Sequence, residues 1–439
     1  MKLSYLGVVL CLLGFNSTNI FGDTNPPGTT YYVATNGNDA NPGTLESPFG
    51  TLNTAASKLK AGDNLLIRGG IYYQTMYCGA SGTPGLPITI AGFPGEMAII
   101  DGVYTNPASS WGALVSVNGS NTSVQQVTIR RSNWMGLSLK GAYDQAIGVT
   151  SEANMENGIL ASETGHDSLV QGCSVHENAK SNENFQNTRG GWSSGLSAAR
   201  GANNCTLRGN IVWGNWGEGV STYEASYTLI ESNTIYNNQL NLYLSDTTHS
   251  IARGNLIYST PSNNPCANSD QMGIGLGDET SNPASSDNMV VNNLLLGNQR
   301  NIYSWLGGKR GGLVNVTIAF NTCANSSRDT NLKILSGKHS NTLVANNIFL
   351  QEDTLPVAIV PATQGITYSH NLWSKTPPSI AAGPGDVTAD PQLLKIGTLA
   401  PGLLSSDWFL YTQTSPGCAR EPVHLPALGQ SKVLHHLAI

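Results

Sequence analysis

Charged residues end several similar short segments in the middle of the sequence. The segments are GLSAAR (195–200), GVSTYE (219–224), NLYLSD (241–246), GIGLGD (273–278) and NIYSWL (301–306). The sixth residue of the first four is Arg200, Glu224, Asp246 and Asp278. If these segments are neighbouring strands about 4.8 Å apart, three carboxylates stack in a column beside an arginine.

Such a column could serve three purposes. Two unit charges about 5 Å apart repel by roughly 3 kcal/mol at an effective dielectric near 20. A hard cation such as calcium, held by oxygens of Glu224, Asp246 and Asp278, would relieve this repulsion. One carboxylate could instead stay protonated as a general acid, or all three could point into water as charges that oppose aggregation.

The alternation of the same segments predicts strands with one inward and one outward face. The second and fourth residues are apolar or small and are expected to point inward, so the third and fifth point outward. The outward rows then contain small residues and rings, namely Ser197, Ser221, Tyr243, Gly275 and Tyr303 in one row, and Ala199, Tyr223, Ser245, Gly277 and Trp305 in the other. Aromatic platforms beside a low glycine floor favour binding of a sugar chain.

Repeated asparagines place these strands in a larger architecture. Six segments share a short strand, an asparagine, a few apolar residues, a turn and a second strand. The shared residues are Asn210, Asn233, Asn255, Asn293, Asn321 and Asn347, at steps of 23, 22, 38, 28 and 26 residues. One coil of a solenoid per repeat explains the steps, and stacked asparagine amides would satisfy one another at a buried bend.

This pattern resembles the right-handed parallel β-helix proteins of the pectate-lyase-like superfamily. The N-terminal segment YYVATNGNDANPGTLESPFGTLNTAASKLKAGDNLLIRGGIY is similar to the opening of family-nine pectate lyases. The resemblance implies an all-β fold, a single-stranded right-handed parallel β-helix with capped ends. It also implies a capping helix from Thr51 to Leu59, which would cover the end coil.

The resulting domain organisation has four parts. Residues 1–22 contain a lysine followed by a short apolar run and are predicted to be a secretory signal peptide. Residues 23–62 are predicted to form the N-terminal strand and capping helix, 63–372 the parallel β-helix, and 373–439 a C-terminal capping segment.

Two insertions precede second strands of the repeats, namely ENAKSNENFQNTRGGWSS and STPSNNPCANSDQ. We expect them to rise on either side of a cleft that Trp192 lines.

The resemblance implies a polysaccharide lyase that cleaves a uronate-containing glycan by β-elimination, with calcium on the carboxylate column. Its base would be a lysine or arginine, and the candidates are Arg200, Lys309, Lys333, Lys180 and Arg189. The sequence departs from family-nine pectate lyases because it lacks their clustered calcium-binding aspartates. A glycoside hydrolase that uses Glu224 and Asp246, or Glu224 and Asp278, is the second hypothesis. The third is a non-catalytic glycan-binding protein.

Other ionisable residues near the column receive a structural interpretation. Glu218, Glu279 and His176 are interpreted in this way, and Glu163 could extend the column by one coil.

Composition restricts the partners. The chain of 439 residues has 11% charged residues, 49 glycines and a formal charge of −6, without a run of lysines and arginines. We therefore expect no nucleic-acid partner, no membrane span, and a secreted or cell-surface monomer that acts on an extracellular polysaccharide.

Overall fold

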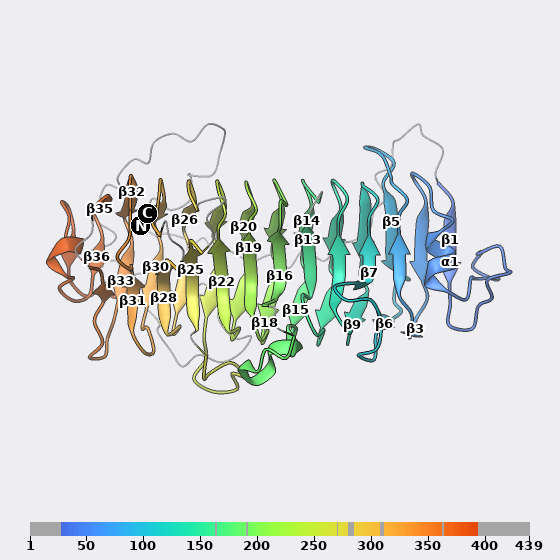
Figure 1. Cartoon of the computed structure of the whole chain (residues 1–439), viewed down its shortest axis with the longest axis horizontal. Helices are drawn as coiled ribbons and strands as arrows, with labels where there is room; N and C mark the ends of the chain where they lie inside the picture. Colours follow the sequence, from blue (N-terminus) through green and yellow to red (C-terminus); the bar gives the residue numbers. More distant parts are fainter. Residues whose placement is uncertain are drawn as a thin grey trace, which may run out of the picture.

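The computed structural model describes residues 28–162, 165–189, 192–269, 271–279, 285–307, 311–361 and 364–393. In these residues the chain winds into coils stacked along one long axis (Figure 1). Successive coils contribute strands to three parallel sheets of thirteen, eleven and thirteen strands, here called sheets A, C and B. The predicted all-β parallel β-helix is therefore confirmed.

The strands of each sheet follow the order of the coils. Sheet A contains β1 (Thr30–Val33), β2 (Asn64–Ile67), β5 (Ile88–Gly92), β8 (Thr122–Gln125), β11 (Gln145–Ile147), β14 (Leu169–Gln171), β17 (Thr206–Arg208), β20 (Leu229–Glu231), β23 (Ile251–Arg253), β26 (Met289–Val291), β29 (Thr317–Ala319), β32 (Thr342–Ala345) and β35 (Ile366–Ser369). Sheet B contains β3 (Gly70–Tyr72), β6 (Ala98–Asp101), β9 (Thr128–Arg130), β12 (Thr150–Glu152), β15 (Ser174–His176), β18 (Ile211–Trp213), β21 (Thr234–Tyr236), β24 (Leu256–Tyr258), β27 (Leu294–Leu296), β30 (Thr322–Ala324), β33 (Ile348–Leu350), β36 (Leu372–Trp373) and β37 (Val387–Thr388). Sheet C contains β4 (Met76–Cys78), β7 (Ala113–Val117), β10 (Met135–Leu139), β13 (Ile159–Ser162), β16 (Ser194–Ala199), β19 (Glu218–Tyr223), β22 (Leu240–Ser245), β25 (Met272–Gly277), β28 (Arg300–Trp305), β31 (Thr330–Lys333) and β34 (Ala358–Ile359).

The core is a continuous stack of aliphatic side chains inside the coils. In sheet C, Val220, Leu242 and Ile274 occupy the same register position and are at most 1% exposed. Leu207 and Ile230 pair in the same way in sheet A. Because each coil repeats the same inward positions, every strand buries its apolar face against the coils above and below.

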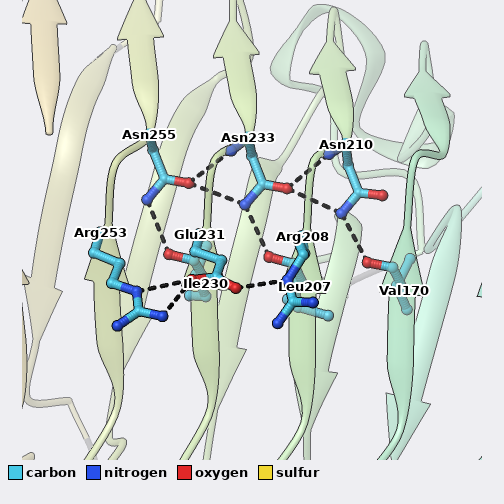
Figure 2. A network of polar contacts seen from close by, with 9 residues as sticks. All are labelled: Val170, Leu207, Arg208, Asn210, Ile230, Glu231, Asn233, Arg253 and Asn255. Carbon is cyan, nitrogen blue, oxygen red and sulfur yellow. Dashed lines mark hydrogen bonds and ion pairs between the residues drawn. The ribbon is translucent and has the colours of Figure 1, made fainter. Parts of the chain in front are cut away.

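The asparagine ladder predicted from the repeats lies at the bend between sheets A and B. Figure 2 shows Asn210, Asn233 and Asn255, in which the amide nitrogens of Asn210 and Asn233 each donate to the side-chain oxygen of the asparagine in the next coil at 2.9 Å. The ladder continues to Asn371, and the backbone N–H of Cys173 donates to Asn210, as expected from its position. Buried backbone groups at the bend are satisfied in this way.

A second amide ladder, not predicted, lies at the bend between sheets B and C. It runs through Asn154, Asn178, Asn215, Asn238, Asn241, Asn298, Asn301, Asn331 and Gln351. A row of glycines makes room for it. A Cβ at Gly195 would lie 2.6 Å from Asn215 Nδ2, and one at Gly136 would lie 2.7 Å from Asn154 Nδ2.

The N-terminal cap is shorter than expected. Helix α1 spans Leu52–Ala56, and Thr51 is its N-cap, with Thr51 Oγ1 accepting the N–H of Thr54. Lys58 and Leu59 donate to carbonyls three residues back, so the segment closes in tighter turns. Two 3₁₀ segments, η1 (Lys180–Phe185) and η2 (Ser379–Ala381), lie outside the coils.

Of the predicted domain boundaries, the one at residue 372 lies among the last strands of sheet B. The boundary at residue 372 falls inside β36, and β37 still pairs with it in parallel. The predicted signal peptide lies outside the described residues. Among the residues that are described, no helix is long and apolar enough to cross a bilayer.

Candidate functional site

The outer face of sheet C carries the two predicted rows in the predicted register. Ser197, Ser221, Tyr243, Gly275 and Tyr303 pair in sequence from β16 to β28. The second row, Ala199, Tyr223, Ser245, Gly277 and Trp305, pairs in the same strands. The alignment of the repeats on their asparagines therefore gave the correct register.

A break in the strand alternation adds a third outward row. Asn241 points inward to the second amide ladder and Leu242 points inward to the core, so two consecutive residues face the interior. Leu240 is thereby turned outward, where it packs with Tyr243. Glu218 pairs with Leu240 and opens β19, so it lies on the outer face as well.

A groove with a volume of about 770 Å³ crosses the outer face from β10 to β28. Two glutamates, two cations, several hydroxyls and five aromatic rings are prominent in its lining. These residues are Glu218, Glu279, Lys140, Arg200, Ser194, Ser197, Ser221, Trp111, Trp192, Tyr223, Tyr243 and Trp305. Trp111, Trp192 and Trp305 are 44%, 47% and 40% exposed, which leaves their rings open to a ligand.

Glu218 is the buried acid of this groove. It is 7% exposed, and Ser194 Oγ lies 2.9 Å from its Oε2. Burial raises the pKa of Glu218 to about 7, and the negative charge of Glu279 acts in the same direction. Hydrogen bonds from Ser194 and Trp192 oppose this rise. A carboxyl with a pKa near neutrality can both hold and release a proton at physiological pH.

Glu279 follows β25 and is held from two sides. The Tyr243 hydroxyl donates a short hydrogen bond to Glu279 Oε1, and Asp246 Oδ1 accepts the backbone N–H of Glu279 at 2.9 Å. Burial, followed by the neighbouring Glu279, raises the pKa of Tyr243, so its hydroxyl remains a donor. The negative charge of Glu218 also raises the pKa of Tyr243.

The residues of the predicted carboxylate column follow neighbouring strands of sheet C, but their side chains do not come together as a cluster. Arg200, Glu224 and Asp246 have φ of 55°, 50° and 48°, so each ends its strand in a left-handed turn. Asp246 is fully buried and holds the backbone of Glu279, and Asp278, 2% exposed, accepts the N–H of Gly312 at 3.1 Å.

These three carboxylates do not fit the predicted calcium site. Glu224 is half-buried beside Tyr223 and does not line the groove. In the described ranges, no three acidic, histidine or cysteine side chains come together as a metal site.

Some of the aromatic and basic residues predicted for the site line the groove, and others do not. Trp192, Tyr223, Tyr243 and Trp305 line the groove, and Tyr303 does not. Tyr243 and Tyr303 are each 5% exposed and pack into the sheet surface instead of standing out as platforms. Of the predicted bases, Arg200 lines the groove, with its guanidinium 5.8 Å from the Trp111 ring centroid.

The remaining predicted bases lie elsewhere. Lys333 pairs with Asp329 at 2.7 Å and Lys180 with Glu183 at 3.0 Å, while Arg189 donates to Asn133. Lys309 and Glu163 lie outside the described residues.

The two insertions form one wall instead of two. Ala179 from the first and Cys266 from the second pack on Trp216. Both also hold Gln239, through Asn182 Nδ2 at 2.8 Å and Ser269 Oγ at 3.3 Å. In Figure 1 they lie together at the lower edge, in green and yellow-green, beside the starts of β16, β19 and β22. This wall carries Trp192, whose side chain is hydrogen-bonded to Glu218 in the groove.

Gly277 should be essential for the position of Tyr243. An ideal Cβ at Gly277 would lie 2.5 Å from the Tyr243 hydroxyl oxygen, and one at Gly275 would lie 2.6 Å from its ring. We expect Gly277→Ala to displace the ring and to lower the free energy of unfolding by about 1–3 kcal/mol, measured by urea unfolding. In a Tyr243→Leu background the same substitution should cost clearly less, and equal costs in both backgrounds would contradict the steric explanation.

Comparison with known proteins identifies the family. The model of the Pel9A-like right-handed β-helix region matches residues 31–303, more than half of the chain. The protein therefore belongs to the Pel9A-like right-handed β-helix family.

Individual relatives cover the chain unevenly. Over 135 residues it is 33% identical to the uncharacterized protein YwoF of Bacillus subtilis, and over 73 residues 34% identical to the pectate lyase PEL9 of Emericella nidulans. These alignments cover 31% and 16% of this chain, and 26% and 18% of the two relatives, so the chain matches less than a third of either. The crystal structure of pectate lyase Pel9A is similar over 93% of this chain and 94% of that one, with a TM-score of 0.55 and 17% identity. At this identity the likeness shows the fold alone.

Proposed function

We propose that this protein is a secreted, monomeric enzyme that hydrolyses a glycosidic bond in an extracellular polysaccharide. The observation that carries the proposal is the pair Glu218 and Glu279 in one aromatic-lined groove. Glycoside hydrolysis uses two carboxyl groups, one of which is protonated and has a raised pKa. This is the hydrolase alternative of the sequence analysis, transferred from Glu224, Asp246 and Asp278 to residues that line the groove.

Each residue has a defined role in this reaction. Glu218 would give its proton to the glycosidic oxygen, because its pKa of about 7 keeps it mostly protonated in weakly acidic solution. The carboxylate of Glu279, fixed by Tyr243 and Asp246, would act on the anomeric carbon or on a water that attacks it. Trp111, Trp192 and Trp305 would support sugar rings along the groove.

A polysaccharide lyase is the second candidate, and two observations favour it. The family match is to a pectate-lyase-like region, and Lys140 and Arg200 line the same groove. A lysine or arginine there could accept the proton that β-elimination removes. Calcium remains a proposal that belongs to this candidate, without a described ligand set to support it.

One screen separates these functions. Purified protein is incubated with pectate, alginate, glycosaminoglycans and neutral polysaccharides, with calcium chloride or with EGTA, while reducing ends and ultraviolet absorbance are recorded together. We expect new reducing ends without absorbance, insensitive to EGTA and absent in Glu218→Gln. Absorbance that requires calcium would overturn hydrolysis in favour of the lyase, and binding without either signal would indicate a glycan-binding protein.

A further inference from the structure

Two side chains from opposite edges of sheet C meet at one end of the groove. The Trp111 ring centroid lies 5.3 Å from that of Trp134 and 5.8 Å from the Arg200 guanidinium. Trp111 comes before β7, on the side where the strands begin, and Arg200 follows β16, on the side where they end. Ser194 and Arg200, at the two edges of the sheet, are six residues or about 20 Å apart. Trp111 and Arg200 therefore form a bar across the groove, here called the end bar.

The end bar is fixed to the elements around it. Asn133, which precedes β10, donates its backbone N–H to Asn106 O at 2.7 Å and so holds the loop that carries Trp111. Arg189 of the first insertion donates to Asn133 Oδ1 at 2.9 Å, and its guanidinium lies 4.3 Å from the centroid of the Trp134 ring. Contacts between a cation and an aromatic face are attractive. The end bar is thus continuous with the wall that the insertions form.

The groove stops at the end bar and continues in the other direction. At the bar its lining includes Met135 of β10, and none of the described residues of β4 or β7 contributes to it. At the other end the lining reaches Trp305 of β28, whose ring is 40% exposed. Glu218 on β19 lies three strands from β10, or about 14 Å along the helix axis. Between Glu218 and the bar there is room for a few sugar units.

We propose that the protein cleaves its polysaccharide from one chain end and releases a short oligosaccharide of constant length. The inference rests on the proposed function, because it takes Glu218 as the point of cleavage. A chain that enters past Trp305 advances until its terminal sugar meets Trp111 and Arg200. The bond beside Glu218 is then always the same number of sugars from that end. The interior of a chain cannot lie along the whole groove, because the end bar blocks its way out.

Trp111→Ala combined with Arg200→Ala tests this inference, and Trp305→Ala is the matched control at the other end. Both residues of the end bar are exposed, so the double variant should fold. On the polysaccharide identified by the screen, we expect wild type to release one product size from the first minutes, with little loss of viscosity for each bond broken. The double variant should release many product sizes and lower the viscosity faster at equal numbers of new reducing ends. Trp305→Ala should raise KM but keep the single product size. A wild-type enzyme that releases many sizes from the start, or a double variant that keeps the single size, overturns the inference.

A second measurement counts bound protein and does not require activity. Glu218→Gln is titrated calorimetrically with size fractions of the polysaccharide that the screen identifies by cleavage or by binding. Recognition of a chain end predicts one bound protein per chain at every length. With Trp111→Ala and Arg200→Ala added, the number per chain should rise with length. A number that rises with length while the end bar is intact overturns the inference. One protein per chain, in a protein whose wild type breaks no bond, overturns the proposed function and leaves recognition of the chain end in place.

Discussion

Glu218→Gln should lower kcat at least a hundredfold on the glycan that the protein cleaves. Glutamine keeps the size and the hydrogen-bonding capacity of the side chain but cannot give a proton to the leaving oxygen, and general acid catalysis typically contributes 10²- to 10⁴-fold. Glu279→Gln should cause a loss of the same order, because it removes the second carboxylate of the groove. KM should change little in either variant.

Glu224→Gln is the matched control for these substitutions. Glu224 lies in the carboxylate column predicted from the sequence, but it does not line the groove. We expect its replacement to leave kcat within about threefold of wild type. If Glu224→Gln were as inactive as Glu218→Gln, the assignment of the acid to Glu218 would be wrong.

The pH profile distinguishes an acid from a base at Glu218. An acid must be protonated to act, so kcat/KM should fall as the pH rises through about 7, the pKa of Glu218. A base would produce the opposite limb, with activity rising through the same pH. The limb near pH 7 should be absent from the residual activity of Glu218→Gln.

The raised pKa of Glu218 also predicts that the free energy of unfolding depends on pH. Folding raises the pKa of Glu218 above its ordinary value, so the protonated form stabilises the fold at low pH. This contribution is complete below about pH 4.5, where the unfolded chain also holds the proton, and is lost as the pH rises to about 7. The difference corresponds to about 3 kcal/mol. Urea unfolding should show wild type losing stability relative to Glu218→Gln between pH 5 and pH 8, and parallel curves would contradict the burial of the carboxyl.

Much of the fold could be predicted from the sequence because one physical requirement repeats in each coil. An inward asparagine at the bend between sheets A and B must find partners in the next coil, and its spacing therefore reports the length of each coil. The same spacing gave the strand register of sheet C. The second ladder was missed because its amides include neighbours such as Asn238 and Asn241, which do not repeat once per coil.

The candidate site could be predicted only in part, because strict alternation fails at the start of these strands. Two successive inward residues, Asn241 and Leu242, reverse the side on which the preceding residue lies. Alternation carried back from Ser221 therefore places Glu218 inside the core, although it lies in the groove. The side-chain directions at the strand ends could not be predicted for a different reason. The left-handed turn at Asp246 directs its carboxylate to the backbone of Glu279 and not to its neighbours in the column.

Asn233→Ala should lower the free energy of unfolding by about 3–5 kcal/mol. The Asn233 amide donates to Leu207 O and Asn255 Oδ1, and its oxygen accepts two N–H groups of Asn210 (Figure 2). Alanine leaves these partners without the bonds that Asn233 supplied, at a position that is 1% exposed. Each buried group left unsatisfied costs about 1–3 kcal/mol.

The row of ion pairs formed by Arg208, Glu231 and Arg253, next to the asparagine ladder, provides the control. Arg253 donates to Glu231 in the same coils (Figure 2), at 2.5 and 2.8 Å. The side chain of Arg253 is 27% exposed. Water can replace a partner there, so Arg253→Ala should cost about 1 kcal/mol or less. Urea unfolding of both variants tests the contrast, and equal losses would mean that the buried amides do not carry the stability of the bend. Because each coil contacts only its neighbours, a defect at Asn233 should also let the coils on either side unfold at different urea concentrations.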